Sequence, residues 1–184
     1  MRLPDDRYEF IKREVIHLLG KYQVDCIPVS GFELLTKMGI TLRPYSSLSA
    51  KALAKALEVS ADGFYIDSGT EEIVFYNDVE RSYSRIDMTL KHEAGHAALG
   101  HTGTKDKADE EEAEAAFFAK YASAPPPLVH RIRPRSASDL IEPFGLSYEA
   151  AEYAYGYYRK WLRYGARQYL PYEMDLLKLF SATA

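Results

Sequence analysis

Residues 88–99 read Met-Thr-Leu-Lys-His-Glu-Ala-Gly-His-Ala-Ala-Leu, and this stretch predicts a helix that carries His92 and His96 four positions apart. Positions i and i+4 lie on one face of a helix, one turn apart. Two imidazoles in that arrangement can hold one zinc ion at about 2.0–2.1 Å each. Glu93 is offset around the helix, so it can reach a water on the metal rather than the metal itself. The pattern predicts a metal centre with Glu93 as its catalytic carboxylate; the alternative is a helix with two half-exposed histidines and no metal.

A catalytic zinc ion takes three protein ligands and keeps one open position. The helix expected over 109–123 begins with a run of acidic residues that offers the third ligand. Glu114 shares a face of that helix with three aromatic side chains, and a carboxylate on an inward face must be paired or metal-bound. We therefore predict Glu114 as the third ligand. Glu111, on the edge of the same stripe, is the second choice, and Glu112, on a face of alanines, is the third.

His101 is a further candidate close to this helix. It follows His92 by nine residues, which is about 180° around an ideal helix. It can therefore reach the metal only if the helix has ended. A polar residue at the helix C-terminus is the simpler interpretation. The metzincin continuation is excluded because Thr102 stands where that class has its third histidine.

The pattern on either side of the histidines predicts an α+β fold with a small, mostly antiparallel sheet. Strands are expected at 40–43, 63–67 and 72–76, the last two forming a hairpin around a Ser-Gly-Thr turn. Helices are expected from Arg7 to Leu19 with Asp6 as N-cap, from a capping box at Ser30 to Gly39, and over 49–57.

The prolines at 125–127 are expected to end the ligand helix, and a linker should follow to residue 135. We predict two units, a metal-binding domain at 1–127 and a helical subdomain at 128–184. The second unit should be helical over 136–180 with a break at 144–145, and Ser147 should cap a helix reaching about residue 170. This arrangement is similar to a helix-turn-helix. Its second helix begins with Tyr148 and Glu149, and an acidic start would repel phosphate. We therefore favour packing or protein binding over direct DNA binding.

The composition of the chain is that of a globular protein. It has 184 residues, of which 47% are hydrophobic and 27% charged. The net charge of −4 argues against a dedicated nucleic-acid coat. Cys26 is the only cysteine, which suits a reducing cytosol. The sequence offers no apolar run long enough to span a bilayer and no secretory signal at its start, so we expect a cytoplasmic protein without a membrane partner.

Three segments resemble the ImmA/IrrE-type zinc metallopeptidases of bacteria and their mobile elements. Residues 85–96, Arg-Ile-Asp-Met-Thr-Leu-Lys-His-Glu-Ala-Gly-His, are similar to the family's Arg-x-x-Phe-Thr-Leu-Ala-His-Glu-Leu-Gly-His. Residues 112–119, Glu-Ala-Glu-Ala-Ala-Phe-Phe-Ala, with Pro125, are similar to its Glu-x-Glu-Ala-Asn-x-Phe-Ala and Leu-Leu-x-Pro. Residues 139–150 are similar to its segment ending in Phe-x-Val-Ser-x-x-Ala. The chain departs from the family at Ala116, where asparagine is usual, and at Ser123-Ala124, where two leucines are usual.

The resemblance implies a zincin-like fold, a zinc ion on His92, His96 and Glu114, and Glu93 as general base. It implies hydrolysis of a peptide bond in a specific protein, often a helix-turn-helix transcriptional repressor from the same operon. One alternative is a non-catalytic regulator whose zinc-stabilised fold binds a repressor or DNA. Another is a stress-response or toxin–antitoxin component that binds its partner without cutting it.

Two features of the catalytic site stay open at this point. Tyr76, Tyr83 and His101 are candidates for the group that stabilises the oxyanion, on the ground that they are close in sequence. The substrate is expected to add a strand along residues 72–76. The alternative is that this segment is an internal strand of the sheet.

Overall fold

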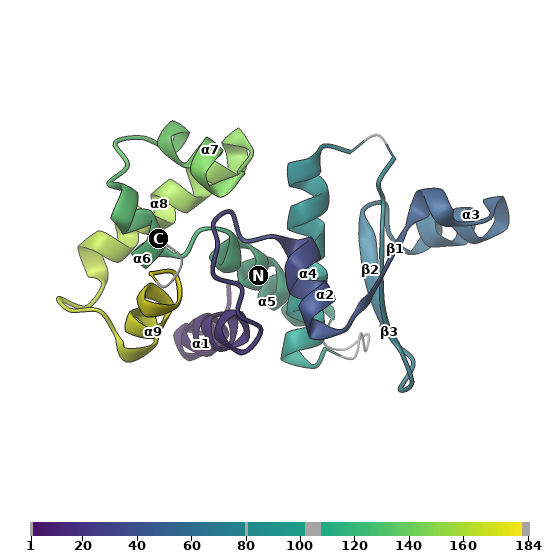
Figure 1. Cartoon of the computed structure of the whole chain (residues 1–184), viewed down its shortest axis with the longest axis horizontal. Helices are drawn as coiled ribbons and strands as arrows, with labels where there is room; N and C mark the ends of the chain where they lie inside the picture. Colours follow the sequence, from purple (N-terminus) through teal and green to yellow (C-terminus); the bar gives the residue numbers. More distant parts are fainter. Residues whose placement is uncertain (1, 80, 102–107, 182–184) are drawn as a thin grey trace.

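The computed structural model describes residues 2–79, 81–101 and 108–181 and shows an α+β chain (Figure 1). A small sheet and its helices occupy one end, and the last helices of the chain occupy the other (Figure 1). Helices α1 (Asp5–Lys21) and α5 (Ala108–Ser123) lie between the two ends and pack against each other. The polar loop expected over 100–106 lies mostly outside the described residues.

The sheet has three strands in the order β1–β3–β2. Strand β3 (Glu72–Tyr76) pairs in parallel with β1 (Thr41–Pro44) and antiparallel with β2 (Gly63–Asp67). The hairpin of β2 and β3 confirms the prediction, whereas the expected mostly antiparallel sheet is mixed. Strand β3 is internal, so the expectation that a substrate pairs with residues 72–76 is wrong. Within the described sheet, β1 and β2 form the edges.

One face of the sheet is covered by α2 (Gly31–Met38) and α4 (Tyr83–Leu99). As predicted, Ser30 caps α2 by accepting a hydrogen bond from the Glu33 N–H, and Gly39 ends it with a φ of 85°. Helix α4 begins five residues earlier than expected. The Ser82 side chain caps it by accepting a hydrogen bond from the Arg85 N–H.

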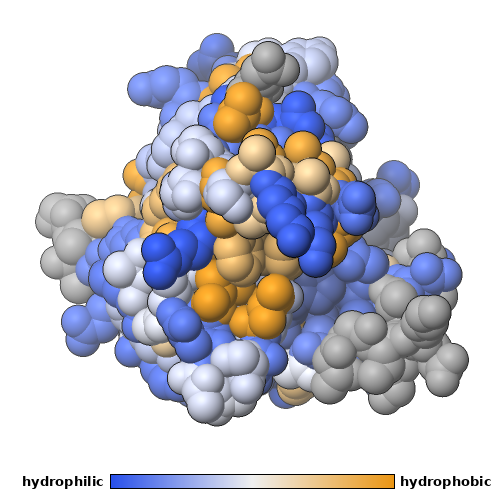
Figure 2. Space-filling model, turned by 90° about the vertical axis from the view of Figure 1, so that its right-hand side faces the viewer, coloured by the Kyte–Doolittle hydropathy of each residue, from blue (hydrophilic) through white to orange (hydrophobic). Residues whose placement is uncertain are grey.

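A short 3-10 helix, η1 (Tyr45–Ser47), and α3 (Ala50–Val59) follow β1. Figure 1 shows α3 at the outer end of the molecule, beyond the sheet. Figure 2 views this end and shows apolar surface surrounded by hydrophilic side chains. The large apolar side chains exposed on α3 and β2 are Leu57, Val59 and Ile66. This end therefore presents a small apolar surface.

The C-terminal part is helical, with different boundaries from those expected. It comprises α6 (Pro126–Ile132), η2 (Ala137–Leu140), α7 (Ile141–Phe144), α8 (Tyr148–Tyr164) and α9 (Pro171–Leu179). Much of the expected linker is helix α6, because prolines are tolerated in a first turn, where the N–H groups lack helical partners. The predicted break is confirmed at Gly145, with a φ of 62°, and Ser147 caps α8. The helix expected to reach residue 170 ends at Tyr164.

Helix α1 begins at Asp5, with Pro4 rather than Asp6 at the N-cap position, and it lies between the two ends of the molecule. It packs against α5 and α9, and the Tyr172 hydroxyl donates a hydrogen bond of 2.8 Å to the Glu9 carboxylate. Buried apolar residues from Leu3 to Phe180 belong to one cluster. The division at residues 127 and 128 stays a prediction.

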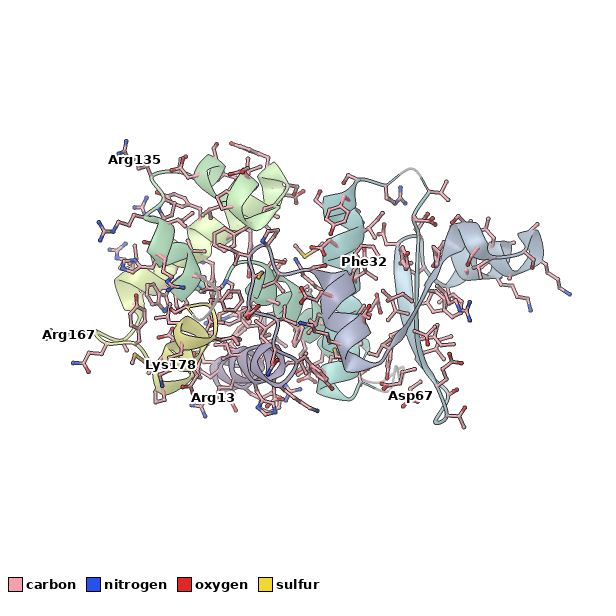
Figure 3. The ribbon with its side chains drawn as sticks, in the orientation of Figure 1. Arg13, Phe32, Asp67, Arg135, Arg167 and Lys178 are labelled. Carbon is pink, nitrogen blue, oxygen red and sulfur yellow. The ribbon has the colours of Figure 1, made fainter. Side chains whose placement is uncertain are left out.

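The basic residues Arg135, Arg167 and Lys178 lie at the end away from the sheet (Figure 3). Tyr155 on α8 donates a hydrogen bond of 2.7 Å to the Arg135 carbonyl, which ties the start of η2 to α8. No helix in the described part of the chain combines the length and apolar character that a membrane span needs.

Candidate metal centre

Helices α4 and α5 approach closely at Gly95. A Cβ atom on Gly95 would lie 3.1 Å from the Ala115 Cα and 3.1 Å from the Phe118 Cβ. Glycine at this position therefore lets the α5 backbone reach α4. The approach brings the first turns of α5 opposite the face of α4 that carries the two histidines.

The side chains of three residues meet across this contact and are called the metal group below: His92, His96 and Glu112. The Nε2 atoms of the two histidines lie 3.1 Å apart, and the Glu112 carboxylate lies 3.1 Å from Nε2 of His92 and 3.3 Å from Nε2 of His96. Ligands about 2.0–2.1 Å from a tetrahedral zinc ion lie about 3.3 Å from one another. Among the described residues these three can hold a metal ion.

The carboxylate in this group differs from the one predicted. Glu114, predicted as the third ligand, is not in the group; it receives a bidentate ion pair from Arg7, with 2.6 Å from Nη2 to Oε2, and it faces His101. The reasoning that a buried acid on that face needs a partner was sound, but the partner is a guanidinium. Glu112 ranked third because its face carries alanines. Small residues mark the face where a second helix packs closely, and that signal favours Glu112.

The pKa values of both imidazoles are lowered, which favours the neutral form that can bind a metal. Burial lowers the pKa of His92 below its ordinary value, although the Glu112 carboxylate opposes this. Burial and the neighbouring His92 lower the pKa of His96 to about 4. Since a metal binds the neutral imidazole, neither histidine needs to lose a proton at neutral pH.

Glu93 lies beside the group and is 5% exposed. Burial and the nearby Glu112 carboxylate raise the pKa of Glu93 to about 8, and a hydrogen bond from the Tyr65 backbone on β2 opposes them. A divalent cation on the three residues would likewise lower the pKa of Glu93, because it favours the ionised carboxylate. The group is therefore suited to take up and release a proton near neutral pH.

A cavity of about 520 Å³ opens on these side chains. Its walls come from α4, from Glu112 on α5, and from Gly63 and Phe64 on β2. A second cavity of about 730 Å³ runs between α4, α5 and α8. Both cavities are lined by Arg85 and Met88, so they are adjacent. The sequence reasoning did not single out Arg85, which forms an ion pair with Asp62 at the cavity wall.

The tyrosines proposed for the oxyanion do not line this cleft. Tyr76 packs edge-to-face on Phe32 with ring centroids 5.5 Å apart, and Tyr83 stacks on the same ring at 6.0 Å. Figure 3 shows Phe32 on α2 beside α4. These rings therefore join α2, β3 and α4. Glu111 is buried in the first turn of α5 and is not in the metal group.

Comparison with known proteins adds no family to this geometry: no protein-family model matches the chain, and no curated protein is significantly similar to it.

Proposed function

We propose that this protein is an intracellular zinc-dependent peptidase that cleaves a specific protein. The observation that carries the proposal is the convergence of His92, His96 and Glu112 beside the buried carboxylate of Glu93, at the floor of a cleft. The resemblance to ImmA/IrrE-type peptidases, noted from residues 85–125, points to the same chemistry. Glu112 takes the place that the resemblance gave to Glu114.

A zinc ion on these ligands would act as a Lewis acid that polarises the scissile carbonyl and acidifies a water. Glu93 accepts the proton of the attacking water on a carboxylate oxygen. It then donates that proton to the amine nitrogen that leaves. Its raised pKa suits both steps, because a group that titrates near neutral pH can take up and release a proton in one turnover.

The substrate would lie along β2. This strand forms an edge of the described sheet, and its residues Gly63 and Phe64 line the cleft. An extended peptide can add to such an edge by main-chain hydrogen bonds. The family resemblance suggests a helix-turn-helix repressor as the protein that supplies this peptide.

The second candidate function is a non-catalytic regulator with a structural zinc site. A structural site normally has four protein ligands and uses no base. The buried Glu93 and the three-ligand set favour the enzyme. A regulator would bind its partner without cutting it, so cleavage separates the two functions.

The test is a comparison of the wild-type protein with a Glu93→Gln variant. Both are loaded with zinc and incubated with a peptide library and with the proteins encoded by the neighbouring genes, with and without chelator. We expect the wild type to cleave only with metal, and the variant to hold zinc without cleaving. Equal cleavage by the variant would remove Glu93 from the mechanism. Zinc binding by both with no cleavage by either would favour the regulator.

A further inference from the structure

His101 is turned toward the metal group by the way α4 ends. Gly100 adopts a φ of 67°, and the His101 N–H donates a 3.0 Å hydrogen bond to the His96 carbonyl. This turn places the His101 ring at the edge of the His96 ring, with centroids 4.9 Å apart and planes at 74°. From the sequence alone, His101 was a candidate for a helix cap, for a direct contact with the metal or for the group that stabilises the oxyanion.

The His101 side chain links His96 to a buried ion pair. Its Nδ1 lies 2.9 Å from Nδ1 of His96, and its Nε2 lies 2.9 Å from the Glu114 carboxylate. The side chains of His101 and Glu114 are only 5% and 4% exposed. Arg7 on α1 is the last member of this series of contacts, through its bidentate ion pair with Glu114. Four side chains from α1, α4, α5 and the turn after α4 thus form one network, of which the Arg7 side chain is partly exposed.

The metal group fixes where the protons of this network lie. If Nε2 of His96 keeps its lone pair for a metal, the proton of the neutral ring is on Nδ1. That N–H must then donate to Nδ1 of His101, so His101 carries its own proton on Nε2 and donates it to Glu114. With both rings neutral, every hydrogen bond is satisfied in this one arrangement.

We propose that His101 is a positioning residue, which holds the His96 ring and its tautomer for metal binding and is itself held by Glu114 and Arg7. The inference rests on the proposed metal centre. Metal-ligating histidines commonly donate their second N–H to a partner that orients the ring. Here a second histidine takes that place. Both His101 nitrogens already have partners, His96 and Glu114. The His101 ring faces Nδ1 of His96 rather than Nε2, so His101 is not a fourth ligand.

Zinc affinity, measured by competition with a chelating dye, tests the proposal without a substrate. We expect His101→Leu to bind zinc about 10–100-fold more weakly than wild type. His101→Asn should recover part of the loss, because its side-chain oxygen can accept the His96 N–H. His17→Leu, a change at an exposed histidine on α1, is the matched control and should bind like wild type.

Two results would overturn the proposal. Wild-type affinity in a folded His101→Leu protein would mean that the side chain only packs. Complete loss of zinc, as expected for His92→Ala, would make His101 a ligand. If His101→Leu does not fold by circular dichroism, Arg7→Lys takes its place; its single ammonium cannot form the bidentate pair, and we expect about tenfold weaker binding. Wild-type affinity in that variant would also overturn the proposal. A failure of the metal centre itself would appear separately, as zinc binding unaffected by Glu112→Ala.

Discussion

At the scale of single residues, the helix that carries the histidines is fixed by a buried ion pair. Lys91 is 1% exposed, and its ammonium lies 2.6 Å from the Asp87 carboxylate one turn earlier. It also donates a 3.1 Å hydrogen bond to Ser123 on α5, and Asp87 accepts one of 2.7 Å from the Gly31 N–H on α2. Burial lowers the pKa of Lys91, against the attraction of Asp87. The pair therefore joins α2, α4 and α5 within the helix that carries His92 and His96.

Removing the cation from this pair should be costly. We expect Lys91→Met to lower the free energy of unfolding by about 3–5 kcal/mol, because it leaves the Asp87 carboxylate buried without its partner. Urea denaturation measures the loss. The double variant Asp87→Asn with Lys91→Met is the control and should recover a large part of the stability. A loss below about 1 kcal/mol in the single variant would show that the pair contributes little.

The sequence predicted part of this residue-scale picture. The spacing of His92, Glu93 and His96 reflects local helix geometry, so it could be predicted. The burial of Glu114 also follows from its helical face. Its partner could not be predicted, because Arg7 lies 107 residues away and the pairing depends on how α1 packs against α5. The sequence therefore favoured Glu114 as the third ligand, whereas the structure groups Glu112, two residues away, with the two histidines.

At the scale of elements, the contact between α4 and α5 brings together the residues of the candidate metal centre. Gly95 is the position of closest approach, and the small face of α5 lies against it. The contact aligns His92 and His96 of one helix with Glu112 of the other, the group that could hold a metal ion. Element boundaries were predicted where a local cap sets them, as at Ser30 and Ser147. They were wrong at α6, where a proline run begins a helix.

Gly95→Ala separates helix propensity from packing. Alanine favours an isolated helix by about 1 kcal/mol over glycine, but here its Cβ would press on the α5 backbone. We expect the variant to bind zinc more weakly, because α5 must shift away from α4. The matched change, Gly156→Ala on α8, meets no atom within 4 Å and should gain up to about 1 kcal/mol of stability with unchanged zinc affinity. If Gly95→Ala and Gly156→Ala bind zinc equally well, close packing of α4 and α5 at Gly95 is not needed for zinc binding.

At the scale of the whole molecule, α1 couples the metal-bearing helices to the C-terminal helices. Its Arg7 reaches Glu114 on α5, and its Glu9 reaches Tyr172 on α9. The α+β class was predictable from periodicity. The route of α1 was not, because long-range packing of an amphipathic helix leaves no local signal of its partner.

The Glu9 contact predicts a pH dependence of stability. Burial raises the pKa of Glu9, but hydrogen bonds from Lys12 and Tyr172 outweigh it, so the pKa lies below its ordinary value of 4.5. The stabilisation is therefore present above about pH 4.5 and is lost as the pH falls through the folded-state pKa. We expect Tyr172→Phe to lower the free energy of unfolding by about 1 kcal/mol at pH 7 and by less near pH 3. An equal loss at both pH values, measured by urea denaturation, would contradict this.

The most direct test of the account is zinc binding by the wild type and by two variants of the same turn of α5. Glu112→Ala removes the proposed third ligand, and Glu110→Ala changes an exposed neighbour as the matched control. We predict one zinc ion per chain for the wild type and for Glu110→Ala. For Glu112→Ala we predict a loss of zinc affinity of at least about a hundredfold, which is more than the loss typical of a residue that only supports a ligand. Full zinc binding by Glu112→Ala would contradict the account.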